Sequence, residues 1–155
     1  MGILKKPFFR GQSENRLDVK GRLRIPAKYR EVLQQHYTDA LIITKRDHCL
    51  VAYPPETWEL IEEKASELSL VSPDSHAYLR MQISYAEECE FDSKGRVLIP
   101  PALRAEGRLN TEVVLLGTLK GFEIWDKVLW QTYREEMKER ENYQRYTDYA
   151  ASFGL

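Results

Sequence analysis

The residues best suited to chemistry in this sequence are cations that recur in a fixed pattern. Residues 18–30 read DVKGRLRIPAKYR and residues 92–104 read DSKGRVLIPPALR, so Asp, Lys, Gly, Arg, Ile, Pro and a second Arg recur in register after 74 residues. Lys and Arg side chains bind phosphate oxygens, and Arg can also donate two hydrogen bonds to one guanine. The pattern therefore predicts a polyanion-binding element that occurs twice in the chain.

Charge is segregated along the chain, although the formal net charge is only −1. Residues 1–30 hold nine Lys and Arg against two acidic residues, a local charge of +7. Residues 54–92 hold ten Asp and Glu against two basic residues, a local charge of −8. This split predicts a basic, polyanion-binding face on an otherwise acidic, soluble body. The alternative is that the basic residues only solvate an N-terminal tail, and charge alone does not decide between the two.

Patterns typical of enzymes and metal sites are missing from the sequence. The three histidines have neither H-E-x-x-H nor metal-ligand spacing, and there is no Gly-rich phosphate loop. His48 and Cys49 are neighbours in an expected strand, so their side chains point to opposite faces, which predicts an exposed His and a core Cys. A cluster of acidic residues is interpreted as a solvated strand entry: Glu87, Glu88, Glu90 and Asp92. We expect no catalysis, cofactor, metal or small-molecule substrate.

The cysteines and the apolar runs indicate the compartment. Cys49 and Cys89 lie singly, which predicts two reduced, buried thiols rather than a disulfide framework or a zinc site. No apolar run approaches the roughly 18 residues that cross a bilayer. The N-terminal MGILKKPFFRG has too little apolar sequence for a signal peptide. We therefore expect a cytoplasmic protein without a membrane partner.

Both halves of the chain show the same order of expected elements. A short strand enters the motif, a Lys-Gly turn reverses the chain, a second strand leaves it, and a helix begins after Pro26 or Pro100. Two β-rich runs and a helix carrying Trp58 or Trp130 follow. The expected strands and first helices span residues 16–18, 22–25, 27–35, 41–44 and 49–53 in the first half, and 90–92, 96–99, 101–106, 113–116 and 122–125 in the second.

The helices that carry the tryptophans have apolar stripes at helical spacing, which we interpret as core or subunit contacts rather than a cofactor site. The stripes are Trp58, Ile61, Ala65 and Leu68, and Trp130, Tyr133 and Met137. A further helix is expected near residues 75–87, and one long exposed helix from Tyr133 onward. The expected boundaries are 8–60 for repeat 1, 61–87 for a helical linker, 88–131 for repeat 2 and 132–155 for a C-terminal helix.

Each half is too short to stand alone, because a hairpin and a few strands of about 50 residues bury too little apolar surface. Two copies in one chain therefore predict a pseudo-twofold module in which each half completes the barrel of the other.

The motif D-x-K-G-R-x-x-I-P-x-x-x-R, present twice, is similar to the SpoVT/AbrB-type DNA-binding repeat. With FRG at 9–11, CLVAYP at 49–54, FEIW at 122–125 and the paired helix tryptophans, nearly the whole chain resembles the MraZ family of bacterial transcriptional regulators. The resemblance implies an α+β, β-rich fold in which two tandem AbrB-like swapped-hairpin halves form a pseudo-twofold β-barrel with flanking helices. The same resemblance implies homo-oligomeric rings of about eight to twelve subunits.

The resemblance further implies a sequence-specific repressor that binds double-stranded DNA at short direct repeats upstream of a division and cell-wall gene cluster, within the nucleoid. Its expected DNA contacts are five basic residues: Lys20, Arg22, Arg24, Lys94 and Arg96. Arg22 and Arg96 match the Arg that contacts DNA in the family, and we expect both guanidinium groups to project outward. Four residues are expected to shape the loops: Asp18, Gly21, Asp92 and Gly95.

Two questions stay open at this point. Arg30 and Arg104 are either DNA contacts or internal partners of the two Asp residues, and Arg10 and Arg16 are further candidates for phosphate contact. The alternative function is an antitoxin-like protein-interaction module with the same fold.

The two copies are not equivalent. Residues 18–30 carry a charge of +4 and residues 92–104 a charge of +2, because Arg24 aligns with Leu98 and Lys28 with Ala102. We therefore expect the N-terminal loop to dominate affinity.

Overall fold

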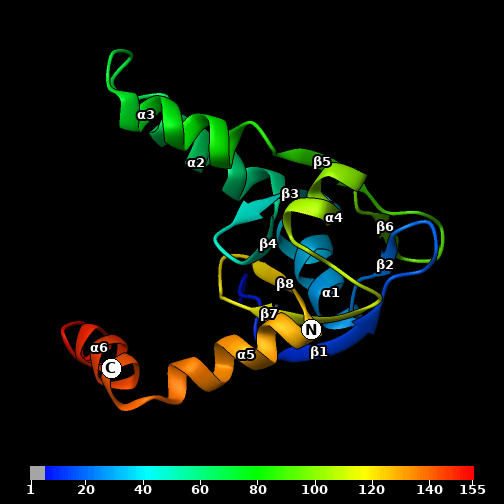
Figure 1. Cartoon of the computed structure of the whole chain (residues 1–155). Helices are drawn as coiled ribbons and strands as arrows, with labels where there is room; N and C mark the ends of the chain where they lie inside the picture. Colours follow the sequence, from blue (N-terminus) through cyan, green and yellow to red (C-terminus); the bar gives the residue numbers. More distant parts are fainter. Residues whose placement is uncertain (1–5) are drawn as a thin grey trace.

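The structure is a computed structural model of the whole chain, and it describes residues 6–155. The expectation that the chain starts without a signal peptide depends partly on residues 1–5, which lie outside the described residues. The chain forms a mixed α+β fold (Figure 1). Its elements are β1 (Gln12–Arg16), β2 (Arg22–Arg24), α1 (Ala27–His36), β3 (Ala40–Arg46), β4 (Cys49–Tyr53), α2 (Pro55–Ala65), α3 (Pro73–Tyr78), the short π-helix η1 (Leu79–Ile83), β5 (Glu87–Glu90), β6 (Arg96–Leu98), α4 (Pro101–Glu106), β7 (Glu112–Gly117), β8 (Phe122–Asp126), α5 (Lys127–Lys138) and α6 (Arg140–Ala151).

Strand pairing crosses between the two halves of the chain. Six strands form an antiparallel sheet in the order β1-β7-β8-β4-β3-β5, and β2 pairs with β6 in a separate two-stranded ribbon. The first strand of each half lies beside the third strand of the other, since β1 pairs with β7 and β5 pairs with β3. The β4–β8 and β2–β6 pairs join equivalent strands of the two halves. Neither half can therefore complete its sheet alone.

The expected barrel does not close among the described residues. The six-stranded sheet ends at β1 and β5, and the ribbon is joined to the β1 side by an isolated bridge between Leu17 and Leu23 and by a hydrogen bond from Nδ2 of Asn15 to the carbonyl of Arg24. The strands that enter the motifs end at Arg16 and Glu90, earlier than predicted. Asp18 and Asp92 cannot extend these strands because their side chains accept hydrogen bonds inside the following turns.

The main core lies between the inner face of the sheet, α1, α4 and the inner face of the ribbon. Tyr29 on α1 stacks on Phe122 of β8 with ring centroids 4.7 Å apart. Leu23 and Val97, the central residues of the ribbon, are buried in this core and form a cross-strand pair. Because successive side chains of a strand alternate between faces, their neighbours in the ribbon point outward. The core thereby fixes the orientation of the repeated motif.

Helices α2 and α5 cover the outer face of the sheet and then extend away from it. Trp58 packs with Val51 and Tyr53, while Trp130 and Tyr133 pack around Trp125, as core contacts of the kind predicted. Figure 1 shows two helical arms, α2–α3 and α5–α6, on the side of the sheet away from the turns near β2 and β6. No described helix has the length and apolar character needed to span a membrane.

The two outer helical segments differ from their predictions. The helix expected near residues 75–87 begins at Pro73 and ends at Ile83, with Ser72 as its N-cap. The C-terminal segment is two helices rather than one, because Glu139 has an extended backbone, with φ −60° and ψ 141°, between α5 and α6. Neither Gly nor Pro lies at this break, and nothing in the structure explains it.

Candidate nucleic-acid interface

The repeated motifs form two tight turns of the same geometry. In the first, the backbone N–H of Gly21 donates to the carbonyl of Asp18 at 3.0 Å, and the N–H of Asp18 donates to the carbonyl of Arg22 at 3.1 Å. Gly21 has φ of 85°, and its counterpart Gly95 has φ of 75°. Such positive φ values favour glycine, since a Cβ is strained there. The Gly of each motif is thus required by its turn.

The two Asp side chains close these turns from inside. Oδ1 of Asp18 accepts hydrogen bonds from the backbone N–H groups of Lys20 and Arg22, both at 2.9 Å. Asp92 accepts the equivalent bonds from Lys94 at 2.9 Å and Arg96 at 3.0 Å. The backbone N–H of Arg22, together with its guanidinium, lowers the pKa of Asp18 to about 2. The pKa of Asp92 is also lowered, chiefly by the backbone N–H of Arg96.

Arg22 and Arg96 lie on the outer face of the ribbon, and each guanidinium is held in an ion pair that the sequence did not predict. Nε of Arg22 donates to Oδ2 of Asp18 at 2.5 Å, and Nε of Arg96 donates to Oδ2 of Asp92 at 2.9 Å. The two Arg side chains are 33% and 22% exposed, and Nη1 of Arg96 also lies 3.8 Å from Oδ2 of Asp18. The ion pairs with Asp18 and Asp92 use the Nε atom of each guanidinium. An external partner would meet the terminal Nη groups.

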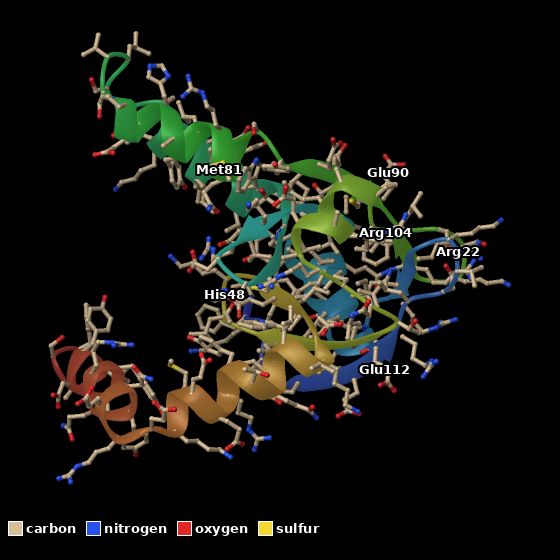
Figure 2. All side chains as sticks on the ribbon, viewed as in Figure 1. Arg22, His48, Met81, Glu90, Arg104 and Glu112 are labelled. Atoms are coloured by element: carbon tan, nitrogen blue, oxygen red, sulfur yellow. The ribbon has the colours of Figure 1, made fainter. Side chains whose placement is uncertain are left out.

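Exposed cations surround these two ion pairs. Lys20 and Lys94 are exposed on the turns, and Arg24 is exposed on β2. Nη1 of Arg24 donates to the carbonyl of Lys94 at 2.9 Å, which joins the two turns. The turns lie side by side at the end of the molecule away from the helical arms, where Arg22 is labelled in Figure 2. All five basic residues predicted as DNA contacts are therefore gathered in one region.

The outer face of the ribbon combines positive charge with an apolar side chain. Arg22 lies opposite Leu98, and Arg24 lies opposite Arg96, in the antiparallel register of β2 and β6. Leu98 is 53% exposed. Reasoning from charge missed this leucine as part of the face, although its alignment with Arg24 placed it there.

Arg104 lies against the first turn, although it belongs to the second motif. Its Nε donates to the carbonyl of Ile99 at 3.1 Å. A methyl group at Gly21 would lie only 2.5 Å from Cζ of Arg104. Arg104 therefore packs on the turn of the other repeat and does not pair with an Asp of either motif.

Arg30, which belongs to the first motif, lies against the turn of the second motif. A methyl group at Gly95 would lie 3.2 Å from its Nη1. The guanidinium also pairs with Asp39 at 3.1 Å and lies 4.5 Å from the centre of the Phe91 ring. Both Arg30 and Arg104 therefore make internal contacts, with partners other than Asp18 and Asp92, and a contact of either residue with DNA stays a prediction.

The remaining basic candidates lie outside the two turns. Arg16 pairs with Glu112 at 3.4 Å, and its side chain is 71% exposed. Arg10 and Lys28 are also exposed. These three residues could extend a basic surface along β1 and α1.

The alternative chemistry at His48 and Cys49 has no support in the geometry. His48 is exposed, whereas Cys49 is buried, and burial raises the pKa of the Cys49 thiol well above its usual range. A thiol with a raised pKa is a poor nucleophile because the thiolate is the reactive form. Among residues 6–155, no group of three or more His, Cys, Asp or Glu side chains is arranged to hold a metal ion.

Comparison with known proteins identifies the family of this chain. The family model described as "MraZ protein, putative antitoxin-like" matches residues 8–81 and again residues 83–152. The chain is 56% identical over 150 residues to the transcriptional regulator MraZ of Syntrophobacter fumaroxidans, which covers 97% of this chain and 99% of the relative. It is 42% identical over 131 residues to the transcriptional regulator MraZ of Shewanella denitrificans, which covers 83% of this chain and 86% of the relative. With two family matches in tandem, in agreement with the duplicated turns, the chain belongs to the MraZ family.

Proposed function

We propose that the protein is a transcription regulator that binds double-stranded DNA through its paired turns. The observation that carries this proposal is the joint position of Lys20, Arg24 and Lys94, which are exposed together on a ribbon fixed to the core. The names of the relatives, transcriptional regulators, support the same function.

The geometry of the ribbon suits the major groove, which admits a two-stranded ribbon. Arg24 and the terminal Nη groups of Arg22 and Arg96 would donate hydrogen bonds to base edges or phosphates, and the two lysines would neutralise phosphates. The Asp–Arg pairs limit the rotamers of Arg22 and Arg96 before DNA arrives, so less side-chain entropy is lost on binding. Asp18 and Asp92 would then act on DNA only indirectly, by positioning these arginines.

A further part of the proposal concerns fold type and assembly. The exchanged pairing of β1 with β7 and of β5 with β3 supports the swapped-hairpin assignment. Two apolar surfaces left uncovered in a single chain support self-association: a hollow of about 870 Å³ beneath α2 and the exposed aromatic residues of the C-terminal segment. Those residues are Tyr143, Tyr146, Tyr149 and Phe153. A ring of subunits would present several pairs of turns to spaced direct repeats.

The DNA-binding proposal is tested by the salt dependence of affinity for a duplex from upstream of the gene itself. The variant Lys20→Ala/Arg24→Ala removes two exposed cations from the turns, and Arg80→Ala/Lys138→Ala removes two exposed cations from the helical arms as a control. On B-DNA each lost phosphate contact reduces the slope of log affinity against log salt by about 0.9. We expect the slope to fall by the equivalent of one to two phosphate contacts in the turn variant, and to stay unchanged in the control variant. An unchanged slope would remove the turns from the interface.

Assembly on direct repeats is tested with duplexes that carry one, two or three repeats. A ring that engages several sites at once gains affinity through effective concentration, by about 10²–10⁴-fold for a second linked contact. We therefore expect a steep rise between the first and second repeat, together with an oligomer in sedimentation velocity. Equal affinity for all three duplexes would contradict the repeat-binding assembly and leave DNA binding itself intact.

The second candidate function is an antitoxin-like module that binds another protein, and the description of the matching family favours it. The two functions differ in one simple measurement. A regulator binds the upstream duplex and releases it at high salt, whereas a protein-interaction module leaves the duplex unbound at every salt concentration. Retention on the duplex would also support a place in the nucleoid, and lower transcription from that duplex in the presence of the protein would support a role as a repressor.

A further inference from the structure

Val19 is the most exposed apolar residue of the repeated motifs. It lies at the tip of the first turn, between Asp18 and Lys20, and is 99% exposed. The equivalent position in the second turn is Ser93. The two turns therefore have the same backbone geometry and present different chemistry at their tips.

The fold does not account for a valine at this position. The turn is closed by the bonds of Asp18 and by the positive φ of Gly21, and neither involves the side chain of residue 19. Polar residues such as Ser, Asn and Asp are typical of turns because their side chains hydrogen-bond to nearby backbone, as valine cannot. Burial does not favour it either, given its exposure. Single exposed apolar residues are common on protein surfaces, so a partner is indicated by the position of Val19 at the tip of a turn that is proposed to bind DNA.

The surroundings of Val19 indicate the chemistry of that contact. The next residue, Lys20, is an exposed cation, and Arg22 presents its terminal Nη groups from the same turn. On the edges of base pairs in the major groove, the C5-methyl of thymine is the apolar group, and apolar side chains recognise it. We propose that Val19 contacts a thymine methyl and makes the first turn prefer thymine at one position of the operator, an inference that rests on the proposed DNA-binding function.

This contact would distinguish the two turns. Ser93 offers a hydroxyl that both donates and accepts, so the second turn has no comparable preference for the methyl group. A module whose turns were identical would read a site equally well in either orientation. Val19, together with the other exposed differences between the turns, favours one orientation of the pseudo-twofold module on each repeat.

The experiment is a double-mutant cycle between the protein and the DNA. The full-length protein and Val19→Ser are titrated, at one fixed salt concentration, with the upstream duplex and with duplexes in which each thymine of a repeat is replaced in turn by uracil. Uracil lacks only the C5-methyl and keeps the base pair and O4. Val71→Ser is the matched control, because Val71 is 89% exposed on the loop between α2 and α3, far along the chain from the turns.

At one position we expect uracil to weaken binding of the unchanged protein about fourfold, the ratio that corresponds to about 0.8 kcal/mol for one buried methyl-sized group. Val19→Ser should bind the thymine duplex about fourfold more weakly and lose the difference between thymine and uracil at that position. Val71→Ser should keep the difference.

Two results would overturn the inference while the proposed function stands: no position sensitive to uracil, or an equal uracil effect in the unchanged protein and in Val19→Ser. Failure of the unchanged protein to bind any duplex would overturn both. Thermal unfolding of Val19→Ser checks that its fold is intact, which the exposure of Val19 leads us to expect.

Discussion

The two turns share their internal bonds and differ in what they expose. Asp18 and Asp92 make the same three hydrogen bonds, within 0.4 Å of each other in length. Two pairs of positions that differ between the motifs are buried in the core, Leu23 and Val97, and Tyr29 and Leu103. Others are exposed, among them Val19 and Ser93, Arg24 and Leu98, and Lys28 and Ala102. The repeated Asp and Gly thus maintain the turns, and the unrepeated exposed residues distinguish what each turn presents to a partner. Differences in DNA-sequence specificity between the turns should therefore arise at the unrepeated exposed positions.

The comparison also shows that the two turns are one structural unit. The N–H of Ile25 donates to the carbonyl of Gly95 at 3.2 Å, and the N–H of Ile99 donates to the carbonyl of Gly21 at 2.9 Å. Arg104 and Arg30 lie against the turn of the opposite repeat. Each turn is therefore held by residues of the other half. A substitution in one repeat should therefore alter the structure of both turns.

The largest expected difference between the turns is in DNA affinity when the paired arginine is removed. Arg22→Ala should weaken binding about tenfold or more, since one bidentate contact to a base contributes about 1–3 kcal/mol. Arg96→Ala should weaken it less, because the second motif carries fewer cations and the Arg96 side chain is less exposed. Titration of both variants against the same duplex checks the ranking. A greater loss with Arg96→Ala would reverse the assigned importance of the turns.

Two further substitutions replace the exposed ribbon side chain of one motif with that of the other motif. Arg24→Leu gives β2 the side chain of Leu98, and Leu98→Arg gives β6 the side chain of Arg24. We expect Arg24→Leu to lower affinity several-fold and to reduce the salt slope by about 0.9, the effect of one phosphate contact. Leu98→Arg should change both quantities in the opposite direction. If the two variants changed affinity in the same direction, charge on the ribbon would not be what distinguishes the turns.

Local residues made much of this arrangement predictable. The turns follow from Asp and Gly at fixed spacing, and the helices follow from Pro26 and Pro100, each of which immediately precedes its helix. The strand at 49–53 and the helix at 101–106 have the predicted bounds. These features depend on φ preferences and short-range hydrogen bonds, which a single stretch of sequence contains.

Several features were not predicted from the sequence, and some of them depend on contacts between distant residues. The partners of Arg30 and Arg104 lie on the opposite repeat or on Asp39, so neither motif alone indicates them. The prediction that Arg22 and Arg96 project outward did not include the ion pairs, in which the same Asp that shapes the backbone also binds the guanidinium. The break at Glu139 lacks the Gly or Pro by which a helix end is recognised. Closure of the predicted barrel depended on where the entry strands end, and the turns end them at Arg16 and Glu90.

Stability gives a smaller test of the comparison, through Gly21→Ala and Gly95→Ala. Both positions have positive φ, at which a residue with a Cβ costs about 1–2 kcal/mol. The new methyl group would lie 2.5 Å from Arg104 at Gly21 and 3.2 Å from Arg30 at Gly95, so only Gly21→Ala forces the facing guanidinium to move substantially. Urea unfolding should show the larger loss for Gly21→Ala. Arg104→Ala should bring the two losses closer together, and a difference unaffected by Arg104→Ala would contradict this explanation.

The smallest expected difference between the turns is in acid sensitivity. The folded-state pKa of Asp18 is about 2, below the ordinary value of 3.8, so its charged form stabilises the folded state above about pH 4. That contribution is lost as pH falls from about 4 through about 2, because the unfolded chain then binds a proton that the folded chain does not. Asp92 has a pKa shifted in the same direction.

Asp18 also lies 3.8 Å from Arg96, whereas Asp92 pairs with Arg96 alone, so the first carboxylate interacts with both arginines. We therefore expect Asp18→Asn to remove more of the acid dependence of the free energy of unfolding than Asp92→Asn does. Urea unfolding at a series of pH values between about 6 and 2 measures this, since the gap between each variant and the unchanged protein should narrow as pH falls. A constant gap for Asp18→Asn would mean that its carboxylate charge does not stabilise the turn. The hydrogen-bond geometry of the amide would then be what matters, and the two turns would differ only in the side chains they expose.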